Sequence, residues 1–149
     1  MRPSKRWTDD AGSASLEFVT VGMIMLVPLV YLVLAVASIQ AGAFAVEGAA
    51  RQAARVFVQA RDVGAAQASA QRALIFALAD HGITEPASIA VACRPRPSAC
   101  LTRQGFVTVS VDLTVPLPLV PPVLIGDFPL AVPLHATATE QVSRFWGGR

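Results

Sequence analysis

The sequence predicts an α+β protein in which a long N-terminal transmembrane helix continues into a small domain outside the cytoplasm, made of a further helix and an antiparallel sheet. Three observations carry this prediction. An uncharged apolar run from Phe18 to Ile39 leads into an alanine-rich helical segment reaching about Arg61, and clean apolar–polar alternation follows from Phe106 to Val115. Only 15% of the 149 residues are charged while 54% are hydrophobic, which is typical of a membrane-associated chain.

The apolar run from Phe18 to Ile39 is long enough to cross a membrane. As a helix it extends roughly 33 Å, at about 1.5 Å per residue, against a hydrocarbon core of about 30 Å. Basic residues precede it in the segment 2–6, which favours a cytoplasmic N-terminus. Pro28 lies inside the run, where it removes one helical hydrogen bond and is expected to kink the helix.

Three interpretations of this segment compete: a permanent single-pass anchor, a secretory signal peptide, and a processed pilin-type N-terminus. A small-residue site of the kind that signal peptidases cut exists at residues 35–37, so a secreted product beginning after Ala37 is a real alternative. However, the run is longer than the usual apolar region of a signal peptide, about 7–15 residues. Glu17 also fits a signal peptide poorly, because it stands between the basic residues and the apolar run.

The third interpretation rests on the stretch GSASLEFV, which begins at Gly12 and places Glu17 five residues later. It resembles the processing site of type IV pilin-like proteins. With Pro28 in the apolar segment and a small alanine-rich domain, the chain more closely resembles the TadE-like pseudopilins of tight-adherence (Flp) pilus systems. The resemblance is specific from Gly12 to about Arg61, and over the C-terminal half it rests on organisation and on the ATATEQV ending.

The resemblance implies a division into a cytoplasmic prepilin leader over residues 1–12, a transmembrane and polymerisation helix over 13–40, and an extracytoplasmic pilin-like domain over 41–149. A prepilin peptidase would cut between Gly12 and Ser13. Many type IV pilins have an aromatic residue at the position of Ser13, so methylation of the new N-terminus stays open. The implied role is a minor pilin-like subunit, and the implied partners are the peptidase, the major Flp pilin, other pseudopilins, the inner-membrane assembly platform and membrane lipid.

The resemblance also assigns Glu17, with Phe18 beside it, to subunit register and assembly. Glu17 would pair with the new α-amine of Ser13 on a neighbouring subunit. Placing a carboxylate at a membrane boundary costs free energy unless the group is paired or hydrated. Pairing with the α-amine would remove that cost. The alternative is an ordinary first-turn acid that the helix N-terminus favours.

The domain beyond the membrane is expected to alternate between helical and extended segments. The alanine-rich helix presents a small-residue ridge at Ala41, Ala45 and Ala49 that suits close helix packing. We expect a helix break at residues 62–64, a second helix over 65–80 capped by His81-Gly82, strands over 88–93, 106–115 and 134–142, and an extended proline-rich loop over 116–133. The apolar stripe of the second helix is Ala66, Ala70, Ala73, Leu74, Ala77 and Leu78.

The two cysteines, Cys93 and Cys100, lie close together between two predicted strands. Outside the cytoplasm they are expected to form a disulfide, and two free thiols are the alternative. A metal site is less favoured, because the chain has no other cysteine and His81 and His135 are isolated in sequence.

The sequence contains no candidate catalytic or cofactor site. It has no glycine-rich phosphate loop, metal-ligand cluster or triad-like set, so we expect a protein that is not an enzyme. The basic residues are scattered and the net charge is only +2, so nucleic-acid binding is not expected. Two other functions stay open: a membrane-anchored extracytoplasmic binding domain that never enters a filament, and a secreted protein cut after Ala37. The disulfide loop is basic through Arg94, Arg96 and Arg103, and it would face another subunit, an acidic surface or solvent.

Overall fold

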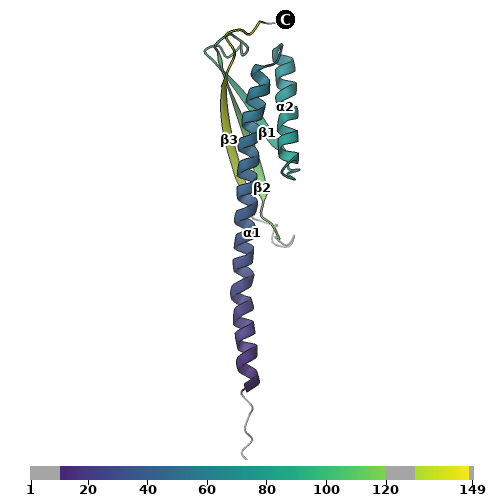
Figure 1. Cartoon of the computed structure of the whole chain (residues 1–149), viewed down its shortest axis with the longest axis vertical. Coiled ribbons are helices and arrows are strands. Elements are labelled where there is room, and N and C mark those ends of the chain that lie inside the picture. The colour runs from purple at the N-terminus through teal and green to yellow at the C-terminus, as the bar shows by residue number, and fades with distance from the viewer. Residues whose placement is uncertain (1–10, 120–129, 148–149) are drawn as a thin grey trace, which may run out of the picture. The chain divides into compact units, whose positions relative to one another are not determined.

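The computed structural model describes residues 11–119 and 130–147, with side chains from residue 14 onward. These residues form two helices and three strands, which confirms the predicted α+β fold (Figure 1). The elements in order are α1 (Ala11–Val58), α2 (Val63–Ala79), β1 (Ala87–Arg94), β2 (Phe106–Pro116) and β3 (Ala131–Gln141). The chain divides into two compact units, Met1–Val36 and Ala37–Arg149, and each is described by itself.

The first unit consists, in its described part, of the N-terminal portion of α1. Its side chains from residue 14 to 36 are exposed except those of Tyr31 and Ala35. Among the described residues α1 is the one helix that is long and apolar enough to cross a membrane, with a mean hydropathy of 2.6 in its most apolar window. This agrees with the span predicted from the uncharged run.

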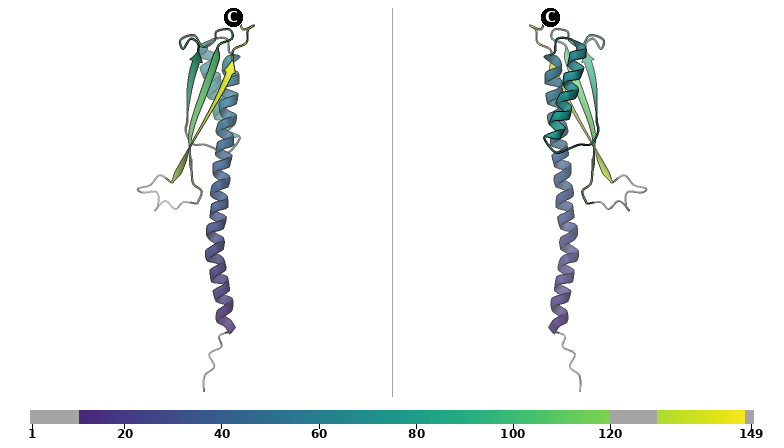
Figure 2. Two further views of the ribbon diagram at one scale, coloured as in Figure 1. Left: turned by 90° about the vertical axis from the view of Figure 1, so that its left-hand side faces the viewer. Right: turned by 90° about the vertical axis from the view of Figure 1, so that its right-hand side faces the viewer.

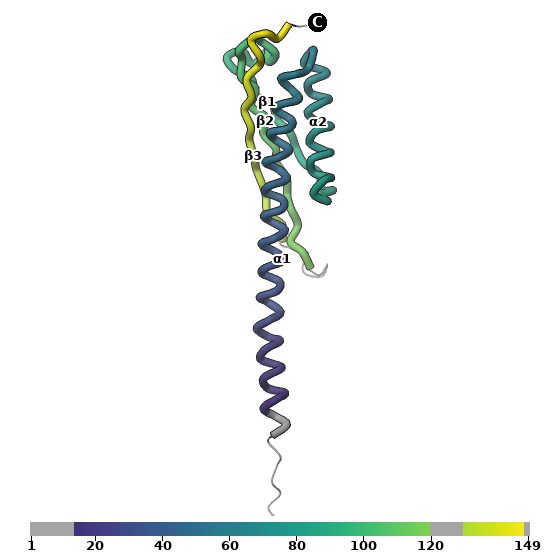
Figure 3. Tube along the Cα trace, in the orientation of Figure 1, coloured from purple at the N-terminus to yellow at the C-terminus, as the bar shows by residue number. Residues whose placement is uncertain are grey.

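The second unit has two layers, a three-stranded sheet and a helical layer. The strand order is β1-β2-β3 and both pairings are antiparallel. The C-terminal portion of α1 and α2 lie side by side on one side of the sheet (Figures 1 and 2). The tube trace follows the chain from α1 into α2 and then into the sheet (Figure 3). One face of the sheet is therefore covered by helices, while the other carries exposed or half-buried side chains.

The core forms where the covered face of the sheet meets the helices. The predicted alternation of β2 is confirmed, because the predicted apolar face is buried and the residues between its members are exposed or half-buried. The buried face consists of Val107, Val109, Val111, Leu113 and Val115. The buried set comes from the second half of α1, from α2 and from the sheet, and its largest fully buried members are Val46, Phe57, Leu74, Val107, Val109, Val111 and Val142. Alanines fill most of the buried face of α1, so the helix axis can approach the sheet closely.

The beginning of α2 differs from the prediction of a break at residues 62–64. α1 ends at Val58 rather than near Arg61, and α2 already begins at Val63. Asp62 is the N-cap of α2, and its carboxylate accepts a hydrogen bond from the backbone N–H of Ala65 at 2.8 Å. An aspartate in this position stabilises the first turn by accepting one of its free N–H groups, so Val63 and Gly64 are helical.

The end of α2 confirms the predicted cap at His81-Gly82. Gly82 adopts a left-handed backbone with φ of 70°, and its N–H donates to the carbonyl of Ala79 at 2.9 Å. The N–H of Ile83 reaches back to the carbonyl of Leu78 at 3.0 Å. This pair of bonds is a Schellman motif, which favours glycine because of its positive φ. Ala66, Ala70, Leu74 and Leu78 on the predicted apolar stripe are buried.

Two further predictions need correction. The small-residue ridge does not run through Ala41, which is exposed, although Ala45 and Ala49 are buried in the core of the same domain. The predicted loop 116–133 has strand residues at both ends, because Pro116 closes β2 and Pro133 lies within β3. Proline is tolerated there because β3 is an edge strand, whose outer side has no ladder partner among the described residues. The middle of that loop, residues 120–129, lies outside the described residues.

Candidate functional site

The predicted processing and assembly residues lie in the first turns of α1. Gly12 and Ser13 belong to the helical backbone, and Glu17 follows about one turn later with an exposed side chain. The ion pairs among the described residues are Glu47–Arg51 and Asp112–His135, and neither includes Glu17. Phe18, directly after Glu17, is 79% exposed. A carboxylate and a large aromatic ring therefore stand together, uncovered, where the apolar run begins.

The apolar part of α1 after Phe18 is exposed among the residues that the structure describes. Its large side chains are exposed on every side of the helix, including Met23, Ile24, Leu26, Leu29, Leu32 and Val33. Burying one such side chain is worth roughly 1.5–3 kcal/mol, so leaving all of them in water is strongly unfavourable. A helix that is apolar all round is typical of a membrane span or of a helix buried among others.

The interior of this helix contains Pro28, and a polar side chain lies two turns before it. Pro28 lacks an N–H, so it leaves the carbonyl of Ile24 without its usual helical partner. The hydroxyl of Thr20 donates to the carbonyl of Leu16 at 2.7 Å, which satisfies that hydroxyl inside the helix. The predicted position of Pro28 within the helix is therefore observed, while the predicted kink stays a prediction.

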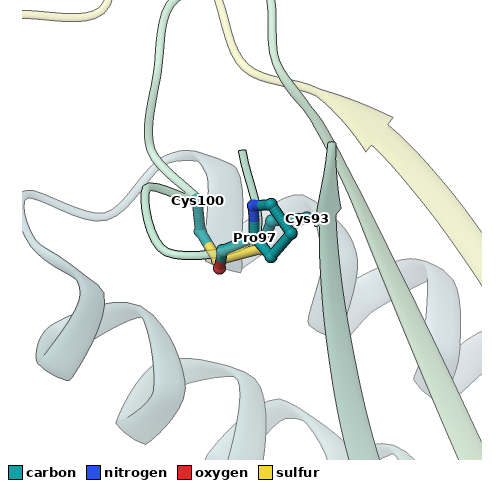
Figure 4. The surroundings of a disulfide bond; sticks show 3 residues. All are labelled: Cys93, Pro97 and Cys100. Atoms are coloured by element: carbon teal, nitrogen blue, oxygen red, sulfur yellow. A yellow bond between two sulfur atoms is a disulfide. The ribbon is translucent and has the colours of Figure 1, made fainter. Parts of the chain in front are cut away.

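The predicted disulfide is present. Cys93 and Cys100 are bonded, with their Cα atoms 5.1 Å apart, and they close the loop between β1 and β2 (Figure 4). Figure 4 also shows Pro97 beside the bridge, and its carbonyl oxygen lies 3.8 Å from the sulfur of Cys100. Leu101, the next residue, is buried, so the loop is attached to the core as well as to itself.

The C-terminal tail is fixed to the core of the domain by a hydrogen bond and by packing. The indole N–H of Trp146 donates to the carbonyl of Ala60 at 3.1 Å, and its ring packs against the core. This bond satisfies one of the free carbonyls just after α1. Phe145, its neighbour, is 83% exposed. Trp146 thus covers the edge of the core, whereas Phe145 does not.

One cross-strand pair could not be found from the sequence alone. Asp112 of β2 lies opposite His135 of β3, and the Oδ1 of the aspartate is 2.7 Å from the Nδ1 of the histidine. Both side chains are 57% exposed on the uncovered face of the sheet, so solvent screens the pair. This contact follows from the strand register, which cannot be deduced from the positions of the two residues in the sequence. Within residues 11–119 and 130–147, no group of three or more histidine, cysteine, aspartate or glutamate side chains is arranged to hold a metal ion.

A long apolar N-terminal helix, a second helix packed beside its C-terminal part and a disulfide-closed antiparallel sheet make up a pilin-like α+β architecture. The membrane-length helix and the disulfide favour a membrane-anchored chain whose domain lies outside the cytoplasm. No family model, curated protein or solved structure matches this chain. The architecture and the residues themselves therefore carry the functional argument.

Proposed function

We propose that this chain is a minor pilin-like subunit, or pseudopilin, of a tight-adherence pilus. A prepilin peptidase cuts it after Gly12, and residues 13–40 hold it in the cytoplasmic membrane until assembly. One observation carries the proposal: an exposed acid, Glu17, stands five residues after Gly12 at the start of an apolar helix whose large side chains are exposed among the described residues. The pilin-like domain that follows supports it.

The uncovered apolar helix supports a polymerisation role because it suits two environments in turn. In the membrane, lipid covers its side chains. In a filament, the same side chains pack against the helices of neighbouring subunits, so the transfer exchanges one apolar environment for another. A helix with a single apolar stripe would turn its polar face toward lipid or toward neighbouring helices. The exposed side chains of this helix are apolar all round, so either environment suits every face.

The role of Glu17 follows from the cost of an unpaired carboxylate in those surroundings. Cleavage after Gly12 creates an α-amine on Ser13, within about one helical turn of Glu17 in the sequence. A neighbouring subunit shifted along the filament brings its own amine to the carboxylate. Removing one partner of such a pair leaves an uncompensated charge in an apolar medium, which is strongly unfavourable. The pair therefore selects one register between subunits.

In this proposal the domain after the membrane helix is a structural part of the subunit and catalyses no reaction. The chain acts with the prepilin peptidase, the major Flp pilin, other pseudopilins and the assembly platform in the inner membrane. A non-enzymatic role is part of the same proposal and stands on the pilin-like architecture.

The experiment that tests the proposal compares two acids on the same helix. Glu17→Gln removes the charge at the start of the apolar run, and Glu47→Gln removes an exposed charge in the domain that pairs with Arg51. We expect both proteins to reach the membrane, and we expect Glu17→Gln alone to abolish pilus assembly or incorporation. Normal assembly with Glu17→Gln would contradict the proposal and favour a membrane-anchored binding domain.

A further inference from the structure

One end of the domain brings the basic disulfide loop together with an arginine of the C-terminal tail. Arg94 ends β1, Arg96 and Arg103 lie in the loop to β2, and Arg144 lies in the tail after β3. The sheet register places Arg94 beside Phe106 and Phe106 beside Gln141, so the three strands reach this end together. In Figures 1 and 2 this is the end marked C, where α1 also ends. We call the surface formed by Arg94, Arg96, Arg103, Arg144, Phe106 and Phe145 the arginine tip.

The arginine tip is held by contacts that join three separate segments. Residues 104 and 105 exchange backbone bonds with Val142, since Gln104 N–H donates to its carbonyl at 3.0 Å and Val142 N–H donates to the carbonyl of Gly105 at 2.8 Å. The Nε of Arg103 donates to the carbonyl of Trp146 at 2.9 Å. The disulfide closes the loop from the other side. The surface is therefore preorganised, which lowers the entropy that a ligand must pay on binding.

The cations of the arginine tip are available to a ligand. All four arginines are exposed, and none takes part in an ion pair within the part of the chain that the structure describes. Glu140 of β3 is the acid nearest to Arg144 in sequence, and it takes part in no ion pair among the described residues. A guanidinium presents a planar fork of donors that matches a carboxylate, which makes unpaired arginines suitable for recognising anions.

Two exposed aromatic rings lie among these cations. Phe106 is 47% exposed and Phe145 is 83% exposed. The guanidinium carbon of Arg144 lies 5.1 Å from the centre of the Phe145 ring, so charge and ring form one surface. Exposed aromatic and arginine side chains are enriched at binding interfaces.

Neutral hydrogen-bonding groups line a shallow hollow beside the arginines. Its volume is about 340 Å³, and it is lined by Gln104, Gln141, Val142, Ser143, Arg144 and Phe145. The side chain of Gln141 donates to the backbone carbonyl of Gln104 at 3.3 Å and keeps its own oxygen as an acceptor. The side chain of Gln104 is exposed. The hollow therefore offers both donors and acceptors to an uncharged polar ligand group.

We propose that the arginine tip binds an acidic polysaccharide. The arginines take the carboxylates of uronic-acid units, the glutamines and Ser143 take the hydroxyls, and Phe145 packs on the apolar face of a sugar ring. Nucleic acid fits less well, because the chain's net charge is only +2 and its basic residues outside the tip are scattered. The proposal rests on the proposed placement of the domain outside the cytoplasm, where such polymers occur.

The test measures binding of oligogalacturonate to the purified full chain in neutral detergent micelles. A neutral dextran oligomer and a single-stranded oligonucleotide of similar length are the comparison ligands. The tip variant is Arg96→Gln/Arg144→Gln, since neither side chain has a hydrogen bond among the described contacts. The matched control is Arg55→Gln/Arg72→Gln, which removes the same charge from exposed positions on α1 and α2. A third variant, Phe145→Ser, tests the aromatic ring without changing the charge.

We expect saturable binding of oligogalacturonate that weakens with added salt, and no binding of dextran. The tip variant should weaken it by about tenfold or more, and the control by less than about twofold. Phe145→Ser should weaken it at unchanged salt dependence. Three results would overturn the proposal: no saturable binding at low salt, equal losses in the tip variant and the control, or tighter binding of the oligonucleotide than of the glycan. Binding is measured on the purified chain, so an absence of glycan binding would not contradict the proposed role in the pilus. Normal pilus assembly by the Glu17→Gln variant would contradict that role and would leave the binding result unaffected.

Discussion

Gly42 offers a sharp test of how α1 packs on the sheet in the domain. A Cβ atom added at this position would lie 2.7 Å from Cδ1 of Leu134 and 2.8 Å from Cγ2 of Val115. Ordinary carbon–carbon contacts are about 3.5–4.0 Å, so both neighbours would have to move by nearly 1 Å. Leu134 is partly buried, and the added Cβ would meet the end of its flexible side chain. Val115, by contrast, is a stiff β-branched residue in the central strand. The variant Gly42→Ala therefore overpacks the core.

The magnitude follows from two opposing terms. Overpacking of this kind costs about 1–3 kcal/mol, while replacing glycine by alanine inside a helix gains about 0.5–1 kcal/mol. Gly48 lies on the same helix, and an added Cβ there meets nothing within 4 Å. Gly48→Ala should therefore stabilise the domain by about 0.5–1 kcal/mol. The difference in unfolding free energy between the two variants isolates the packing term, and we expect it to be about 1–3 kcal/mol.

The assay is denaturant unfolding of the full chain in detergent micelles, followed by tryptophan fluorescence. The chain has two tryptophans, and a Trp7→Phe background leaves Trp146, which packs against the core, as the reporter. A Gly42→Ala variant that is as stable as Gly48→Ala would refute the close approach of α1 to β2 and β3.

Three further predictions concern the same domain. Leu74→Ala removes a buried side chain and should cost about 2–5 kcal/mol of unfolding free energy, whereas Ile75→Ala, at a position 56% exposed, should cost less than about 1 kcal/mol; equal losses would contradict the assignment of the apolar stripe. Asp62→Ala should cost about 1 kcal/mol through the lost N-cap, and Asp62→Asn should restore most of it in the same denaturant titration. Replacing Cys93 and Cys100 together by alanine should cost about 2–3 kcal/mol, because the bridge closes a short loop with a sequence separation of 7. An unchanged denaturation midpoint for that double variant would show that the loop constraint contributes nothing.

The sheet and the disulfide could be predicted because their signals are local. Alternation over residues 106–115 identifies one half-buried strand by itself, since the side-chain period of a strand is two. Cys93 and Cys100 lie close enough in sequence for a turn to bring them together. The uncharged run after Glu17 identifies a membrane-length helix by length and composition alone.

The packing face of α1 could not be predicted because the helix is too uniform. Small residues surround it on all sides between residues 41 and 54, so no single stripe stands out. The ridge chosen from spacing included Ala41, which is exposed, and omitted Gly42, which makes the closest approach to the sheet. Tertiary contacts, rather than local pattern, decide which of several equivalent faces is buried.

The observed bounds of α2 and β3 differ from the predicted bounds for identifiable reasons. The sequence around Asp62 predicts a helix break, but an aspartate before an apolar periodic segment is also an N-cap signal, and here it caps α2. Pro133 predicts a loop, yet an edge strand tolerates proline. The sequence shows that the disulfide loop is basic, but Arg144 and Phe145 join that loop only through the return of the tail, which no local pattern indicates.

The most direct test of the central claim is the N-terminus of the mature protein. The measurement is the N-terminal sequence and intact mass of the chain recovered from cell membranes, with and without the prepilin peptidase. The proposed function predicts a chain that begins at Ser13, and only when the peptidase is present. A chain that begins at Ser38, or one that keeps residues 1–12 in the presence of the peptidase, would contradict it and leave a secreted or simply anchored domain.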